Sequence, residues 1–241
     1  MIWQDYAEQL REVLALEGSP VGVTFSDEPA SNGRSQQTIV CSALYQAARK
    51  GITFNISAST CTCPGGLRSL GLGAPDRQRA ASVKNFLVHG EKFSSCNASF
   101  FRSRALSPSQ PPSGVSEFVV VGPLDEFELK PDLVLFLCNP AQASRLVTLS
   151  SFESGIPVAS QLSSSTCGGA VAIPLATGRI NVSFLDMSSW HLVKGFKDSD
   201  LFFSVPYFLL RSIVESIPLS TAGTAEPGMG YDEVMNRPSS G

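Results

Sequence analysis

Residues 131–147 read PDLVLFLCNPAQASRLV, and this stretch decides the fold class. The run from Leu133 to Cys138 is continuously apolar and rich in residues that favour strands, as expected for a buried strand. Asn139 and Pro140 follow as an N-cap and a first-turn proline, which together predict the start of a helix. A buried strand, a short turn and a helix in this order are typical of α/β proteins.

The segments on either side continue the pattern. Spacing and breaker residues predict helices over 1–14, 41–50, 75–90 and 206–217, and strands over 20–25, 52–56, 117–121 and 179–184. We therefore predict an α/β fold with a mixed sheet flanked by helices. It forms a single domain over residues 1–219, or two lobes divided near the Ser- and Pro-rich loop at 103–114, and 220–241 is a small, polar tail.

The composition excludes several classes of protein. The chain has 241 residues, of which 43% are hydrophobic and 16% charged, with a formal net charge of −3. No basic stretch offers an electrostatic footprint for nucleic acid. The longest apolar runs have the length of strands rather than of membrane spans. Acidic residues at Asp5 and Glu8 argue against a signal peptide, so we expect a cytoplasmic protein.

The cytoplasmic prediction governs how the six cysteines are interpreted. In a reducing compartment, clustered thiols indicate a metal site or catalysis rather than disulfides. Cys61 and Cys63 share one loop, and glycine pairs follow Cys63 and Cys167; these glycines are Gly65, Gly66, Gly168 and Gly169. Each cysteine–glycine motif is expected in a turn, where α/β proteins usually keep their working residues. The glycines would let backbone N–H groups approach the sulfurs.

Thiolates bind soft metals and iron–sulfur clusters, so Cys61, Cys63 and Cys167 are candidate ligands. Cys41 is a candidate further ligand because it lies at a predicted helix N-terminus, which would lower the pKa of its thiol. The alternative for Cys41 is a core residue on the helix face. Cys138 fits a buried strand cysteine better than a ligand, and Cys96 lies in a polar stretch that favours neither role. His191 and the nearby Asp186 fit a polar surface loop.

The chain resembles the family catalogued as domain of unknown function 169. The resemblance rests on the order of several motifs between residues 5 and 217: Ser19-Pro-Val-Gly-Val-Thr-Phe25, Cys41 before an Ala-rich helix, Cys63-Pro-Gly-Gly followed by Leu70-Gly-Leu-Gly73, Asn139-Pro-Ala-Gln142, and Cys167 before Ile173-Pro. It implies roles for Cys41, Cys63 and Cys167, with Cys61 as an addition or an alternative ligand. The segment that begins Phe184-Leu-Asp-Met departs from the Gly- and Cys-containing turn expected there.

These observations favour a protein that binds an iron–sulfur cluster through Cys41, Cys61, Cys63 and Cys167, with a redox or sulfur-handling role. A small-molecule substrate or an electron-transfer partner would accompany that role. A metal-free enzyme with Cys63 or Cys167 as its nucleophile is the first alternative. The second is a non-catalytic ligand-binding or accessory module whose cysteines only pack.

Overall fold

A computed structural model describes residues 2–72, 116–163 and 165–224, together with 81, 85, 88, 89, 235 and 236. The strands are β1 (Val21–Ser26), β2 (Phe54–Ser57), β3 (Phe118–Pro123), β4 (Leu133–Cys138), β5 (Asn181–Phe184) and β6 (Leu201–Pro206). The α-helices are α1 (Ile2–Leu14), α2 (Val40–Lys50), α3 (Pro64–Ser69), α6 (Pro140–Ser151), α7 (Ile173–Thr177), α8 (Met187–Leu192), α9 (Tyr207–Glu215) and α10 (Thr221–Thr224). The shorter elements are 3₁₀ turns at Leu124–Glu126 and Ile217–Leu219 and the π-helix η4 at Gly168–Ala172.

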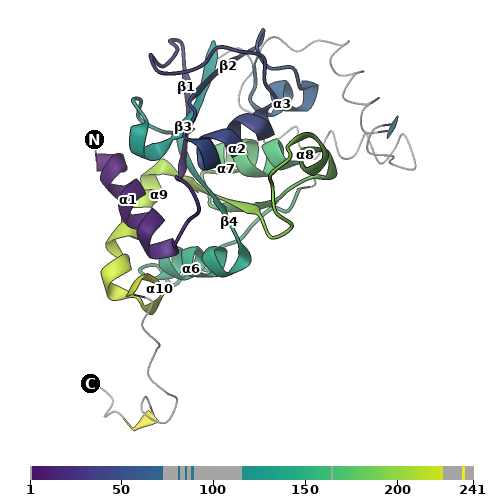
Figure 1. Ribbon diagram of the computed structural model, residues 1–241. Helices are drawn as coiled ribbons and strands as arrows, with labels where there is room; N and C mark the ends of the chain where they lie inside the picture. Colours follow the sequence, from purple (N-terminus) through teal and green to yellow (C-terminus); the bar gives the residue numbers. More distant parts are fainter. Residues whose placement is uncertain are drawn as a thin grey trace.

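The described strands form one six-stranded sheet in the order β2-β3-β1-β4-β6-β5. Figure 1 labels its first four strands, β1 to β4. The α/β prediction is therefore confirmed, with helices on the sheet, but the sheet is not mixed. All five neighbouring pairs among the described strands are antiparallel.

The sheet is antiparallel because strands that run in the same direction are separated by a strand that runs in the opposite direction. The helix between β1 and β2 does join strands that run in the same direction, as α/β connections do. However, β3 pairs antiparallel with both and lies between them. In the same way β1 lies between β3 and β4, and β6 lies between β4 and β5. Local connectivity is thus that of an α/β protein, while β1–β3, β1–β4 and β4–β6 are pairs of strands that do not follow one another in the chain.

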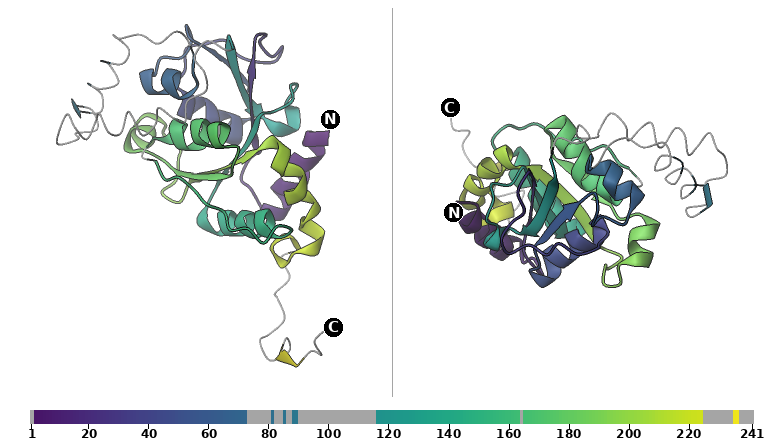
Figure 2. Two further views of the ribbon diagram at one scale, coloured as in Figure 1. Left: turned by 180° about the vertical axis from the view of Figure 1, so that it is seen from behind. Right: turned by 90° about the horizontal axis from the view of Figure 1, so that it is seen from above.

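Helices cover both faces of the sheet (Figure 2). We call the side packed under α2, α3 and η4 the thiol face, and its buried residues include Leu44, Leu67, Leu135 and Phe202. The other side, packed under α1, α6 and α9, is the opposite face, with Leu10, Phe136, Leu146, Phe203 and Ile213. Successive side chains of a strand point to opposite faces, so β4 alone supplies three buried side chains to each core.

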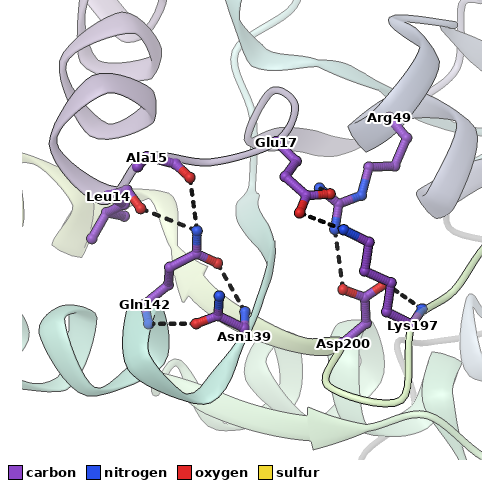
Figure 3. A network of polar contacts seen from close by, with 8 residues as sticks. All are labelled: Leu14, Ala15, Glu17, Arg49, Asn139, Gln142, Lys197 and Asp200. Carbon is purple, nitrogen blue, oxygen red and sulfur yellow. Dashed lines mark hydrogen bonds and ion pairs between the residues drawn. The ribbon is translucent and has the colours of Figure 1, made fainter.

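The predicted helix start at Asn139 is confirmed and closes a capping box (Figure 3). The Asn139 side chain accepts a hydrogen bond from the Gln142 backbone N–H at 2.9 Å, and the Gln142 side chain accepts one from the Asn139 N–H at 2.9 Å. The Gln142 amide also donates to the carbonyls of Leu14 and Ala15 at 3.1 and 2.9 Å. The same two side chains therefore provide hydrogen-bond partners for backbone N–H groups at the start of α6 and for backbone carbonyls at the end of α1.

A second polar network ties the end of α2 to two loops (Figure 3). The Asp200 side chain is only 3% exposed, and its carboxylate accepts a hydrogen bond from Arg49 at 3.1 Å and one from the Lys197 backbone N–H at 2.9 Å. Arg49 also pairs with Glu17 at 3.2 Å, and Glu17 contacts the Lys197 ammonium group. The α1–β1 loop, α2 and the turn before β6 are thereby held together.

Several predictions concern residues outside the described ranges, namely most of the helix expected over 75–90, the loop at 103–114 and Cys96. Strands from before and after 103–114 share the one sheet. The tail begins with α10, where the carbonyls of Ala222 and Gly223 accept hydrogen bonds from Arg145. In the part of the chain that is described, no helix is both long enough and apolar enough to cross a bilayer.

Candidate functional site

The four predicted metal-ligand cysteines come from three segments of the chain, and three of them lie close enough to act electrostatically on the fourth, Cys167. Cys41 is the second residue of α2, Cys61 pairs with Thr38 in an isolated bridge, Cys63 is the N-cap of α3, and Cys167 directly precedes η4. Burial raises the pKa of the Cys167 thiol well above its usual value, and negative charge on Cys41, Cys63, Asp186 and Cys61 would raise it further. The fold therefore gathers the predicted set on the thiol face.

The loop that holds Cys61 and Cys63 is fixed by its neighbour before α2. Thr38 donates its backbone N–H to the Thr60 carbonyl and accepts one from Thr62, both at 2.9 Å. The Cys61 thiol lies 3.6 Å from the Cys63 carbonyl oxygen, and the Cys63 sulfur accepts the Gly66 N–H at 3.3 Å. Cys61 is buried whereas Cys63 is half-buried, so Cys63 is the more accessible of the two.

The two glycine pairs behave differently. A Cβ on Gly66 would lie 2.6 Å from a Val40 methyl carbon and 3.4 Å from the Cys61 sulfur, so a side chain there would crowd the site. The expected approach of a backbone N–H to sulfur is present at Gly66. At Gly168 and Gly169 it is not, because both N–H groups donate to Ser165, at 3.3 and 2.8 Å.

Cys167 lies on a helix rather than in the expected turn. Residues 166–177 are continuously helical and include the widened π turn of η4. A Cβ on Gly169 would lie 2.2 Å from the Ser183 hydroxyl oxygen, so this glycine lets the helix pack directly on β5. Close packing on the sheet therefore outweighs the low helix propensity of two glycines. Single π turns inside helices occur frequently at functional sites.

The prediction of a lowered pKa at Cys41 is wrong. Burial raises the pKa of this thiol to about 11, and the charges of Asp186 and Cys63 add to the rise. A hydrogen bond with the Ser189 hydroxyl and one with the Ser42 backbone act in the other direction. The helix terminus does not decide the outcome because Cys41 is only 6% exposed and loses the solvation that a thiolate needs.

Sequence reasoning missed Thr166 and Ser189 at the site and was wrong to place Asp186 and His191 in a polar surface loop, because Asp186 is the N-cap of α8 and His191 lies in that helix. Asp186 caps α8 and accepts the Ser189 N–H at 2.6 Å, and it also accepts the Thr166 N–H at 2.8 Å. The segment that departs from the expected Gly- and Cys-containing turn thus supplies a carboxylate and a hydroxyl beside the cysteines. The signal that could have found it is the N-cap pattern of Asp186 three residues before Ser189.

The remaining candidates lie elsewhere. Cys138 packs on the opposite face, and burial raises the pKa of its thiol to about 12 with a further rise from Asp200. His89 and His191 are both exposed. The prediction that Cys138 is a buried strand cysteine is confirmed.

The donor set has the chemistry of a soft-metal site, since thiolates suit zinc, copper(I) and iron–sulfur clusters. The raised pKa values keep Cys41 and Cys167 protonated at neutral pH, so a bound metal ion would have to displace their protons. Within the described ranges, no group of three or more His, Cys, Asp or Glu side chains is arranged so that it could hold a metal ion. Binding would therefore require the cysteine loops to rearrange locally.

Comparison with known proteins gives one match at the level of families. The model of DUF169, described as uncharacterised ArCR, matches residues 9–216. No curated protein and no solved structure matches the chain.

Proposed function

The chain belongs to the DUF169 family, and we propose that its Cys41, Cys61, Cys63 and Cys167 bind an iron–sulfur cluster in a redox or sulfur-handling role. The observation that carries the proposal is the convergence of these cysteines on one face from three separate segments: α2, the loop with Cys61 and Cys63, and the helix with Cys167. Structural cysteines have no reason to gather, because each packs equally well as a single small apolar side chain.

Electrostatics supports the same conclusion. Each thiolate in the set would raise the cost of forming the next, as the mutual effects on Cys167 indicate. A cation at the centre reverses that cost, because coordinated thiols are deprotonated outright. A bound cluster would supply electron transfer or labile sulfur, and this chain would supply the thiolates, their burial and the Gly66 N–H at the Cys63 sulfur.

Each cysteine has a distinct part in the proposed site. Cys41 and Cys167 are held on helices and define one side. Cys61 and Cys63 lie on a loop and at a helix N-cap, where a small movement changes the position of sulfur. We expect that loop to close onto the metal, with a cytoplasmic setting that keeps all the thiols reduced.

The test is anaerobic purification followed by iron, sulfide and zinc analysis and visible absorbance. We expect iron and sulfide in the wild type and their loss in a Cys63→Ser, Cys167→Ser double variant. Cys138→Ala is the matched control, because it removes a buried thiol from the opposite face and should keep the metal. A colourless protein without iron or sulfide would refute the proposal.

A metal-free thiol enzyme is the second candidate, and one observation favours Cys63 as its nucleophile. Cys63 is half-buried, and its sulfur accepts a backbone N–H at the start of α3. Burial and the raised pKa make Cys167 the poorer nucleophile. This candidate predicts one cysteine that alkylates rapidly near neutral pH in metal-free protein. Uniformly slow labelling would exclude it, and a double variant that lost neither activity nor metal would favour an accessory module.

A further inference from the structure

We propose that Thr166, Asp186 and Ser189 form a latch that positions Cys167 against Cys41. The inference rests on the proposed function, since it assigns these three residues the role of positioning the cysteine site. They come from two segments about twenty residues apart in the chain, the start of the helix that carries Cys167 and the start of α8.

The first part of the latch is a reciprocal pair of hydrogen bonds between Thr166 and Asp186. The Thr166 backbone N–H donates to the Asp186 carboxylate Oδ2 at 2.8 Å. In return, the Asp186 backbone N–H donates to the Thr166 hydroxyl Oγ1 at 2.8 Å. The backbone directly before Cys167 is therefore held to the start of α8 by two bonds that act in opposite directions.

The second part extends this link to Cys41. The Ser189 hydroxyl donates to Thr166 Oγ1 at 2.9 Å, and the Ser189 side chain lies next to the Cys41 thiol, on whose pKa it acts. Thr166 is 0% exposed and Ser189 only 2%, so water does not compete for these bonds. A continuous chain of contacts thus runs from Cys41 through Ser189 and Thr166 to the residue next to Cys167.

The geometry favours positioning over direct ligation for Asp186. Its Oδ1 accepts the Ser189 N–H at 2.6 Å and its Oδ2 accepts the Thr166 N–H at 2.8 Å, so both oxygens are engaged by backbone. Groups that hold metal ligands from outside typically act in this way, and their loss weakens metal binding without removing a ligand.

The experiment compares Thr166→Val with wild type, because valine keeps the shape of threonine and removes the oxygen that accepts two hydrogen bonds. Cysteine alkylation in metal-free protein is followed residue by residue by mass spectrometry, with Cys138 as the internal reference. We expect Cys41 and Cys167 to label at least about fivefold faster relative to Cys138, as expected for lost hydrogen bonds. Retention of metal by the loaded protein should weaken by about tenfold or more.

Matched variants separate positioning from general destabilisation. Thr166→Ser keeps the hydroxyl and should restore both readouts. Thr24→Val removes another buried threonine bond to an aspartate, that of Thr24 to Asp132 at 2.9 Å, and should alter neither readout. If Thr166→Val does not fold, Ser189→Ala gives the same comparison, since it removes the link to Cys41 and leaves the Asp186 cap in place.

Labelling rates of Cys41 and Cys167 within about twofold of wild type would overturn the latch, because hydrogen bonds that position these thiols should protect them. The two proposals fail separately. A wild type that binds no metal refutes the proposed function, while the alkylation comparison in metal-free protein still decides whether the latch positions the thiols.

Discussion

Each face of the sheet buries cysteine, but the surroundings of the thiol differ between the two faces. On the opposite face, Cys138 stands among apolar side chains such as Phe136 and Leu146. On the thiol face, Cys167 has other cysteines and Asp186 as its electrostatic neighbours. Burial raises the pKa of the thiol on both faces, to about 12 at Cys138 and well above the usual value at Cys167. Burial alone therefore does not distinguish the two thiols, whereas their electrostatic neighbours do.

The polar contacts of the two regions differ in the same sense. Around the helix ends of Figure 3, the Asn139 side chain pairs with a backbone N–H group at the start of α6, and Arg49 neutralises the buried Asp200 carboxylate. On the thiol face, Thr166 and Asp186 join two segments that carry or adjoin candidate ligands. The first kind of contact stabilises the fold, and the second also sets where sulfur atoms lie.

The largest expected effect comes from removing a large side chain from the core of the opposite face. Phe136 is fully buried at the middle of β4, so Phe136→Ala should lower the free energy of unfolding by about 3–5 kcal/mol. Urea unfolding followed by circular dichroism measures this loss. The folded fraction should keep its full metal content; a parallel drop in metal per folded chain would show that the faces are not separable.

The next effect concerns the buried ion pair beside that core. Asp200→Asn keeps the shape of the side chain and removes the charge that Arg49 meets at 3.1 Å. We expect a loss of about 1–3 kcal/mol in the free energy of unfolding, as for a buried hydrogen bond to a charged group. Glu17→Gln is the control, since Glu17 is 55% exposed and water already screens its pair with Arg49. Equal losses in both variants would contradict the assignment of the strong pair to Asp200.

A smaller effect is the dependence of stability on pH that the buried Cys138 thiol causes. A thiol whose pKa is raised on folding stabilises the protein fully below the unfolded pKa, and this contribution is lost as pH rises through the folded pKa. For Cys138 that window runs from about pH 9 to about 12. Between pH 9 and 10, wild type should lose about 1 kcal/mol more stability than Cys138→Ala. Parallel stability curves for the two proteins would show that Cys138 ionises equally in both states.

The smallest effect tests the cap at the start of α6. Asn139→Ala removes the acceptor for the Gln142 N–H and should cost about 1 kcal/mol. Thermal unfolding measures the change, and the alkylation rates of Cys41 and Cys167 should stay at their wild-type values. Faster labelling of those thiols would mean that the helix caps of the opposite face also support the cysteine site.

Much of the local structure follows from sequence. The strand at 133–138, the Asn139 cap and the helix after it were all predicted, because each depends on neighbours only a few residues away. The strand β6 and the helices α3 and α8 were not predicted as elements. The two helices are only six residues long, too short for a periodic pattern, and depend on caps and packing.

By itself, the sequence determined the types of most of the longer elements and which cysteines deserved comparison, since residue chemistry and spacing carry that information. Tertiary structure alone decided that every neighbouring pair among the described strands is antiparallel, because β1 inserts between β3 and β4, β3 inserts between β1 and β2, and β6 inserts between β4 and β5. It also decided that Cys41 meets Ser189 and that Asp186 adjoins Cys167. Contacts between segments far apart in the chain depend on how the whole core packs, and no local pattern records them.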